Sequence, residues 1–155
     1  MDAPSLLRRD HRQIDRLLRS LQAAGPKETR RRKQLRKQLV EDLAVHQDIE
    51  EQVVYPTAEK EAAKTKPAVM KAHEQHELIK GLLNQLKDMS PQEEAFDPKV
   101  AVLADLTRTH FAEEDRAIIR PLATALTADQ LGELGRRIQA GREAITNPKE
   151  YLAMD

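Results

Sequence analysis

The chain has 155 residues, of which 34% are charged and 3% aromatic, with 26 basic and 26 acidic side chains and no cysteine. Its length favours a single domain, and its scarcity of aromatic and β-branched residues excludes a large sheet. The balanced charge argues against a general nucleic-acid-binding role, and the lack of cysteine excludes disulfides, thiolate metal sites and a cysteine nucleophile.

The first three predicted helices follow from apolar side chains that recur at helical spacing. The first covers about residues 4–24 and stops at a Gly-Pro pair. The second covers about residues 28–55, and we expect Pro56 to end or kink it. The third covers about residues 67–87, before a Ser-Pro pair breaks the pattern.

Capping signals predict the last two helices. Asp97 reads as an N-cap with proline at the first helical position, so a fourth helix is expected from there to about residue 121. Thr127 and Gln130 form a capping box for a fifth helix, at about residues 128–142. The tail that begins at Asn147 is expected to fray.

Together these segments predict an all-α fold in one domain over residues 1–155. Its body is an up-down-up-down four-helix bundle at about residues 4–122, and the additional short C-terminal helix follows it. The N-terminus has no apolar signal core, and no stretch approaches 18 apolar residues. We therefore expect a cytoplasmic protein with no membrane partner.

One local run in the second helix is strongly basic. It comprises Arg30, Arg31, Arg32 and Lys33, followed by Arg36 and Lys37. The simplest interpretation is a solvated helix face. The alternative is a phosphate-binding patch.

All five histidines fall on the apolar stripes of the first four helices: His11, His46, His73, His76 and His110. An ionisable group in a core is costly unless it is hydrogen-bonded, paired or bound to metal. A single histidine of this kind is usually a satisfied core residue. Five of them on converging helices indicate a metal site instead.

Two histidines have a glutamate four residues later, His46 with Glu50 and His110 with Glu114. This spacing stacks the imidazole and the carboxylate on one helix face, so each pair offers both to one point in the core. Imidazole and carboxylate without thiolate suit iron, manganese or zinc.

The chain also contains an internal repeat. His11 and His76 both begin the pattern His-x-x-Ile-x-x-Leu-Leu and lie 65 residues apart, while the two His-x-x-x-Glu pairs lie 64 residues apart. Two similar halves facing each other would bring two metal ions side by side. Glu50 and Glu114 would then be placed to bridge them.

These motifs resemble the hemerythrin-like family, the HHE cation-binding domain, over about residues 5–122. The family pattern of His, His-x-x-x-Glu, His and His-x-x-x-Glu is met by His11, His46, Glu50, His76, His110 and Glu114. The resemblance implies a non-haem centre of two iron ions with an oxo or hydroxo bridge. Zinc or manganese could occupy it in the isolated protein.

The sequence departs from the oxygen-carrying members of that family at two places. They have two histidines four apart on the third helix, whereas His73 and His76 are three apart. They also use an aspartate five residues after the last histidine, where this chain has Asp115 beside Glu114. We favour Glu114 as the ligand, because it repeats the spacing of the other pair.

Six ligands leave one iron a protein ligand short, and two residues are candidates for the seventh. His73 would reach the site from the third helix, or lie at the surface. Tyr55 offers a phenolate, but it lies half a turn from the face of His46, so the helix would have to bend. Otherwise it packs at the bundle end. Glu51 and Glu113 are most simply solvated, or else they are partners of ligating histidines.

The resemblance suggests a di-iron protein that handles reactive oxygen or nitrogen species, with catalase-like peroxide decomposition as the specific reaction. A non-catalytic protein that binds or senses O2, NO or iron is the alternative. A helical interaction module with a structural metal is a second alternative. The expected partner is thus a small oxidant such as H2O2 or a diatomic ligand, with no nucleic acid involved, and no redox partner is indicated.

Overall fold

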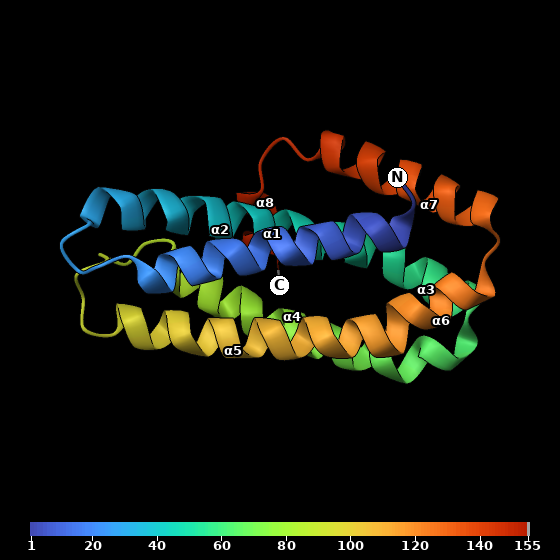
Figure 1. Ribbon diagram of the computed structural model, residues 1–155, viewed down its shortest axis with the longest axis horizontal. Helices are drawn as coiled ribbons and strands as arrows, with labels where there is room; N and C mark the ends of the chain where they lie inside the picture. Colours follow the sequence, from blue (N-terminus) through green and yellow to red (C-terminus); the bar gives the residue numbers. More distant parts are fainter. Residues whose placement is uncertain (155) are drawn as a thin grey trace.

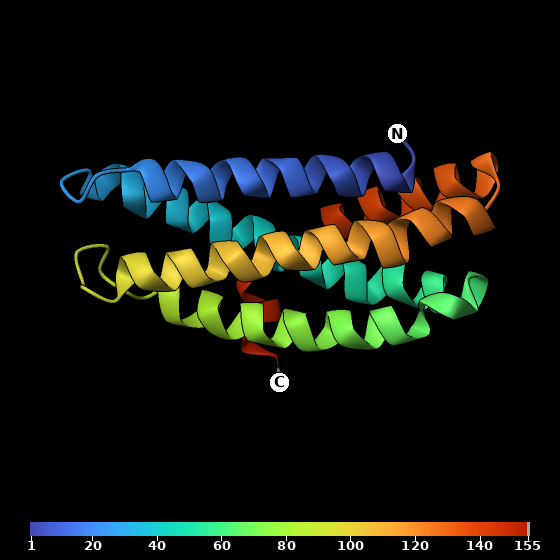
Figure 2. The ribbon, with the colours of Figure 1, turned by 60° about the horizontal axis from the view of Figure 1, so that its bottom comes forward.

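Four long helices run back and forth along one axis in the computed structural model, which describes residues 1–154 (Figure 1). They are α1 (Ala3–Ala23), α2 (Thr29–Ile49), α4 (Lys66–Leu86) and α5 (Phe96–Glu114). Consecutive helices are antiparallel, and both views have them packed as one bundle (Figure 2). No strand occurs within residues 1–154, so the predicted all-α bundle is confirmed.

Two of these helices continue beyond their predicted ends through a π-helical turn. α2 passes through η1 (Glu50–Val54) into α3 (Tyr55–Glu61), and α5 passes through η3 (Asp115–Ile119) into α6 (Arg120–Ala125). A short 3-10 turn, η2 (Ala63–Thr65), joins α3 to α4. Pro56 neither ends the second helix nor breaks it, because it occupies the first turn of α3, where the missing N–H costs least.

The C-terminal part covers the bundle. α7 (Ala128–Ala144) begins at the predicted capping box of Thr127 and Gln130 and packs beside α1 (Figure 1). The expectation that the tail frays is wrong, because α8 (Lys149–Ala153) forms there and contacts α2 and α4. Its Tyr151 and Leu152 are buried, and apolar burial against two helices holds this short element in place.

The predicted N-cap of the fourth helix is also wrong. α5 begins one residue earlier, at Phe96, and Asp97 accepts a hydrogen bond from Arg32 instead of capping. Arg32 is 3% exposed and also donates to the carbonyl oxygen of Pro91 at 2.7 Å. The basic run is therefore not a uniformly solvated face, since one of its arginines ties α2 to the loop before α5.

The apolar core has two parts, one toward each end of the bundle. Leu18, Leu43 and Leu83 belong to one part, and Leu7 and Val54 belong to the other. The buried histidines and glutamates interrupt the apolar stripe between the two. The core thus places its polar residues in the middle of the bundle, where four helices face one another. Among the described residues, no helix is long and apolar enough to cross a membrane.

Candidate metal centre

Six predicted ligands converge in the middle of the bundle. Donor atoms of the first group lie within 4.8 Å of one another, and so do those of a second group. The first group is His11, His46, Glu50 and Glu114; the second is His76, His110, Glu50 and Glu114. Each group therefore combines two imidazoles with the same two carboxylates.

The two carboxylates belong to both groups and lie between their histidines. Glu50 Oε1 lies 3.2 Å from His46 Nε2 and 3.3 Å from His76 Nε2. Glu114 lies 2.9 Å from His11 Nε2 through Oε1, and 3.2 Å from His110 Nε2 through Oε2. Each glutamate thus faces one histidine of each group, which is the arrangement that a carboxylate bridging two ions requires.

The donors fit a pair of metal ions better than they fit one another. His46 Nε2 and Glu50 Oε2 are buried and make no hydrogen bond with any residue in the described range, 1–154. The Nε2 atoms of His76 and His110 face each other at 3.1 Å. A buried polar atom without a hydrogen-bond partner lowers the stability of the folded state. A cation bound between these nitrogen and oxygen atoms would give each of them a partner.

Three of the histidines are oriented by a hydrogen bond on the opposite ring nitrogen. His46 Nδ1 lies 3.3 Å from Asp10, His76 Nδ1 lies 2.9 Å from Glu51, and His110 Nδ1 lies 2.6 Å from the amide oxygen of Gln75. Each partner accepts a hydrogen bond from Nδ1–H, so Nε2 is the ring nitrogen that faces the centre. This is the ring orientation that a metal ion needs.

These outer partners follow the internal repeat but differ in charge. Asp10 precedes His11 and Gln75 precedes His76, so the two occupy equivalent positions in the two halves. One half therefore offers its histidine a carboxylate and the other offers an amide. Arg142 of α7 also donates to Asp10. The two ligand groups consequently have inequivalent surroundings.

A second pair of repeat-related residues diverges further. Glu51 follows Glu50 and binds His76, so it is a partner of a predicted ligand and not a solvated residue. It also accepts a hydrogen bond of 2.5 Å from the hydroxyl of Tyr151 on α8. Asp115, at the equivalent position after Glu114, instead pairs with arginines, at 2.8 Å from Arg8. It lies outside both ligand groups.

Of the two interpretations of Glu113, the simpler one agrees better with the structure, because this residue contacts no predicted ligand directly. It accepts hydrogen bonds from Lys71 at 3.1 Å and from Gln75 at 3.0 Å. Gln75 in turn is the partner of His110. Glu113 therefore supports the site only through this glutamine, at the surface of the bundle.

The buried charges alter the pKa values of the histidines. Burial disfavours the imidazolium of His46, but the charge of Glu50 and the hydrogen bond to Asp10 outweigh burial and raise the pKa of His46 well above its usual value. Burial is likewise outweighed at His76, whose pKa rises to about 9 through hydrogen bonds to Glu50 and Glu51. Protons therefore compete with metal at these positions.

The surroundings also shift the pKa values of two acidic groups, Glu114 and Tyr55, in opposite directions. Burial favours the neutral form of Glu114, but hydrogen bonds that include those from His11 and His110 hold its pKa well below the usual value. Burial and the negative charge of Glu114 raise the pKa of the Tyr55 hydroxyl well above 10. Without metal, the phenol stays protonated beside an ionised carboxylate.

The two candidates for a seventh ligand differ sharply in position. The Tyr55 hydroxyl lies 3.1 Å from His76 Nε2 and 2.5 Å from Glu114, and its side chain is 1% exposed. His73 is exposed and belongs to neither ligand group, and its ring lies nearly perpendicular to that of Tyr55, with ring centroids 5.4 Å apart. Tyr55 therefore lies among the predicted ligands, and His73 does not.

The π-helical turn explains how Tyr55 reaches the site. In a regular α-helix, it would lie on the side opposite His46. A π turn contains about one residue more than an α turn, so it rotates the residues after it by roughly 100°. The bend that we expected at Pro56 is thus a change of helical winding in η1, just before the tyrosine.

The sequence interpretation missed three contributors to the site: Asp10, Gln75 and Tyr151. Asp10 and Gln75 have a signal, because each precedes a ligand histidine at the same position of the repeat. That signal does not tell which histidine they serve, since each binds a histidine of the next helix. Tyr151 has no such signal, because it lies far along the chain from every ligand.

Comparison with known proteins agrees with this geometry. The sequence matches the family described as Hemerythrin HHE cation binding domain over residues 2–122. The chain belongs to this family. The match covers the four bundle helices and all six converging residues, so the buried cluster lies within a domain that binds metal cations, and its histidines and glutamates could hold them.

Two relatives of this HHE domain were found. A crystal structure of a hemerythrin HHE cation binding domain-containing protein from Mycobacterium kansasii has a TM-score of 0.79 and 23% identity. The match covers 99% of this chain and 88% of that one, and it shows a shared fold. A protein named DNA nickase from Nostoc sp. strain PCC 7120 is 23% identical over 145 residues. The match covers 94% of this chain, but it spans only 40% of that longer protein.

Proposed function

We propose that this HHE domain holds two iron ions and decomposes hydrogen peroxide, or consumes a related reactive oxygen or nitrogen species. The observation that carries the proposal is the pair of ligand groups that share Glu50 and Glu114. A pair of bridged, redox-active ions would exchange two electrons with a small oxidant, and iron can supply such chemistry whereas zinc cannot.

The ligand roles follow from the distances. His11 and His46 would hold one ion, and His76 and His110 would hold the other, with both glutamates between them. Partners on Nδ1 keep three of the rings oriented, which makes the site rigid. A rigid site would hold two ions in place when their oxidation state changes.

Tyr55 is the residue best placed to handle a proton. Its hydroxyl donates to Glu114 Oε2 and is buried beside both ligand groups. A phenol in this position can give a proton to an oxygen atom of the oxidant and take it back through the glutamate. Alternatively it binds a metal ion as the seventh ligand. Both roles require the hydroxyl, so removing it tests both.

The surroundings favour a small substrate. A cavity of about 220 Å³ between α4 and α5 reaches His110 and Glu114, and small side chains such as Ala68 and Ala72 line it. Phe111 stacks on the ring of His11 with centroids 3.8 Å apart, which shields that side of the site from water. This combination admits a molecule of the size of peroxide, O2 or NO.

The test begins with the metal content of freshly purified protein, measured by elemental analysis. We expect about two irons per chain, and evolution of O2 when peroxide is added to the iron-loaded protein. Glu114→Gln should lose metal and gas evolution, whereas the exposed neighbour variant Glu74→Gln should keep both.

Other outcomes would overturn parts of this proposal. Two irons without peroxide turnover, together with saturable spectral changes on adding O2 or NO, would assign the domain to binding or sensing. Failure of ferrous reconstitution to raise the iron content would reject the di-iron centre and leave the interaction module as the function to test.

A further inference from the structure

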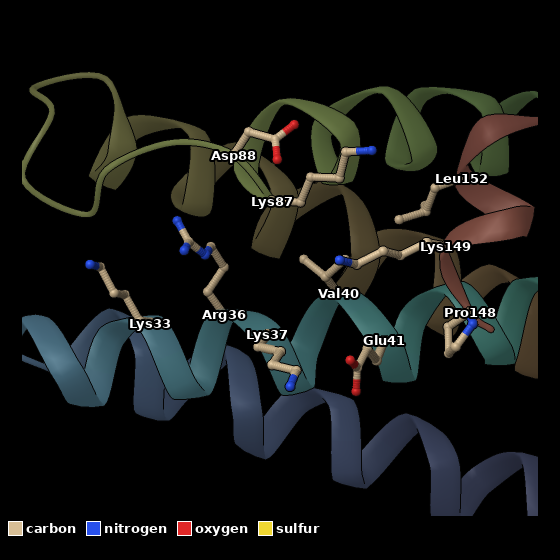
Figure 3. A pocket seen from close by; sticks show the side chains of 10 residues that line it. All are labelled: Lys33, Arg36, Lys37, Val40, Glu41, Lys87, Asp88, Pro148, Lys149 and Leu152. Atoms are coloured by element: carbon tan, nitrogen blue, oxygen red, sulfur yellow. The ribbon is translucent and has the colours of Figure 1, made fainter. Parts of the chain in front are cut away.

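A recess on the surface, away from the metal centre, gathers an unusual share of the positive charge of the chain. It lies between α2, the end of α4 and the start of α8, and has a volume of about 340 Å³ (Figure 3). Its five basic residues are Lys33, Arg36, Lys37, Lys87 and Lys149, and its acidic residues are Glu41 and Asp88. Five positive and two negative side chains leave a net charge of +3 in a chain whose total is zero.

The lysines of this recess are not neutralised by ion pairs. Within residues 1–154, no carboxylate lies within 4.0 Å of the amino group of Lys33, Lys37, Lys87 or Lys149. Some basic residues elsewhere in the bundle do pair, as Arg8 does with Asp115 and Lys71 with Glu113. Four amines that repel one another in one recess are stabilised by an anion among them.

The recess has a fixed floor and an apolar wall. Arg36 donates to the carbonyl oxygens of Leu86 and Met89, so it joins α2 to the end of α4 and holds its guanidinium in place. Val40 and Leu152 line the side toward α8. In Figure 3 the side chains of Lys87 and Lys149 extend over this apolar part from opposite sides.

We propose that this recess binds a small anion that carries several phosphate groups, such as a nucleoside triphosphate. Lysines bind phosphate oxygens as point charges, and several of them around one recess match a ligand with several negative charges. The volume is that of a small-molecule site. Val40 and Leu152 supply a surface for a base or another apolar moiety. A long nucleic acid is disfavoured, because the chain as a whole carries no net positive charge.

Binding here would act on the metal centre through α8. Lys149 and Leu152 line the recess, and Tyr151 between them bonds to Glu51, the partner of His76. A ligand that holds α8 against α2 therefore also holds the hydrogen bond that orients a metal-binding histidine. The recess thus gives the domain a means of responding to a phosphorylated metabolite.

The experiment is a calorimetric titration of the full chain, freed of metal, with ATP and with inorganic triphosphate at low ionic strength. Metal-free protein is used so that chelation of a bound ion by the ligand cannot contribute heat. We expect saturable binding of one ligand per chain that weakens with added salt. Tighter binding of ATP would assign the apolar wall to the nucleoside, and equal affinities would assign the recess to the phosphate chain alone.

Matched charge reversals test the location. The double variant Lys37→Glu/Lys149→Glu should weaken binding at least about tenfold, since each lost charged contact contributes about that factor. The control Lys60→Glu/Lys64→Glu has the same change in net charge on exposed residues near α3 and should bind like the original protein. Lys37→Arg/Lys149→Arg keeps the charge and should also bind. Binding by this variant would show that substitution at these two positions does not by itself abolish binding through misfolding.

A structural measurement completes the test. ATP should slow amide hydrogen exchange in residues 149–153 and leave the helical turn at residues 63–65 unchanged. Absence of saturable binding, equal losses in the two charge-reversed variants, or tighter binding of a DNA duplex than of ATP would overturn the proposal. None of these outcomes bears on the metal centre, because the metal-free protein is the sample.

Discussion

At the scale of residues, the two halves of the centre repeat the same predicted ligands but differ in the residues that surround them. Repeat-related residues supply the same donors, a lone histidine and a His-x-x-x-Glu pair, from each half. The second layer breaks the symmetry, since Asp10 and Gln75 occupy equivalent positions with different charge. Tyr55 adds a phenol near one group, where the other half has Ile119 at the equivalent position. The two ions should therefore differ in affinity and in redox behaviour.

The sharing of ligands predicts how many ions each variant retains. His11→Ala and His110→Ala each remove a donor from one group only, so each should lose about one of two metal ions. Glu114→Ala removes a donor from both groups and should lose both ions. Elemental analysis of the three purified variants checks this. Two ions retained in either histidine variant would contradict the assignment of that histidine.

Proton release distinguishes the two roles of Tyr55. Binding of metal displaces protons from His46 and His76, because their pKa values are raised, and from Tyr55 as well if it becomes a ligand. We therefore expect Tyr55→Phe to release about one proton fewer per chain, measured at pH 7.5 by calorimetry in buffers of different ionisation enthalpy. His73→Gln is the matched control and should release as many protons as the original protein. An unchanged count in Tyr55→Phe would assign Tyr55 to proton transfer and not to ligation.

At the scale of elements, the π-helical turns and the short C-terminal helix α8 bring further residues to the site. One π-helical turn begins at Glu50 and another directly after Glu114, and the first one turns Tyr55 toward the predicted ligands. The short α8 supplies Tyr151, which fixes Glu51. α7 lies so close to the N-terminus that its Gly135 has no room for a side chain. Regular α-helices alone would form the bundle, but they would not bring Tyr55 and Tyr151 to the centre.

Two glycine-to-alanine substitutions should have opposite effects on the free energy of unfolding, because Gly135 of α7 is crowded and Gly81 of α4 is not. A Cβ at Gly135 would lie 2.4 Å from the carbonyl oxygen of Met1, so Gly135→Ala should destabilise the protein by about 1–3 kcal/mol. A Cβ at the exposed Gly81 of α4 meets nothing within 4 Å, so Gly81→Ala should stabilise by up to about 1 kcal/mol through helix propensity. Urea denaturation measures both. A neutral Gly135→Ala would mean that α7 moves freely relative to α1.

At the scale of the whole molecule, the centre is a charged layer between two apolar parts of the core. Without metal, its histidines and glutamates are held together by protons, and with metal the ions replace those protons. The free energy of unfolding therefore depends on pH and on metal together. Metal that binds only the folded bundle adds stability by mass action, about 4 kcal/mol at a thousandfold excess over Kd.

The raised histidine pKa values determine the direction of this pH dependence. A group whose pKa is raised on folding stabilises the protein fully below its unfolded pKa and loses that contribution as pH rises through its folded pKa. For His76 this window runs from 6.5 to about 9, so the melting temperature of the metal-free protein should fall by several degrees across it.

The zinc-loaded protein is the comparison for that experiment, because its ligands have already lost their protons. Its melting temperature should change less over the same range, so the gap between the two forms should widen as pH rises. Calorimetric scans at several pH values, with chelator or with zinc, measure the gap. A metal-free melting temperature that rises between these pH values would show that the buried ion pairs do not carry a proton.

The sequence by itself determined the four-helix bundle and the set of predicted ligands, because both depend on helical periodicity. His46 and Glu50 share a face at a spacing of four whatever the bundle around them does, and the repeat of this pair predicts a second half. The capping box of Thr127 and Gln130 depends only on residues three positions apart, so the sequence also predicted the start of α7. The assignment of metal to these residues stays a prediction that the stoichiometry experiment tests.

Only the tertiary structure decided which further residues join the centre. The choice between Tyr55 and His73 depends on the π-helical turn, which shifts the phase of a helix without any clear local signal. The pairing of Glu51 with Tyr151 joins residues 100 positions apart, through a terminal helix that is held by burial and not by its own propensity. Helical phase beyond such a turn, and contacts between distant helices, are products of packing, so no pattern within a single segment encodes them.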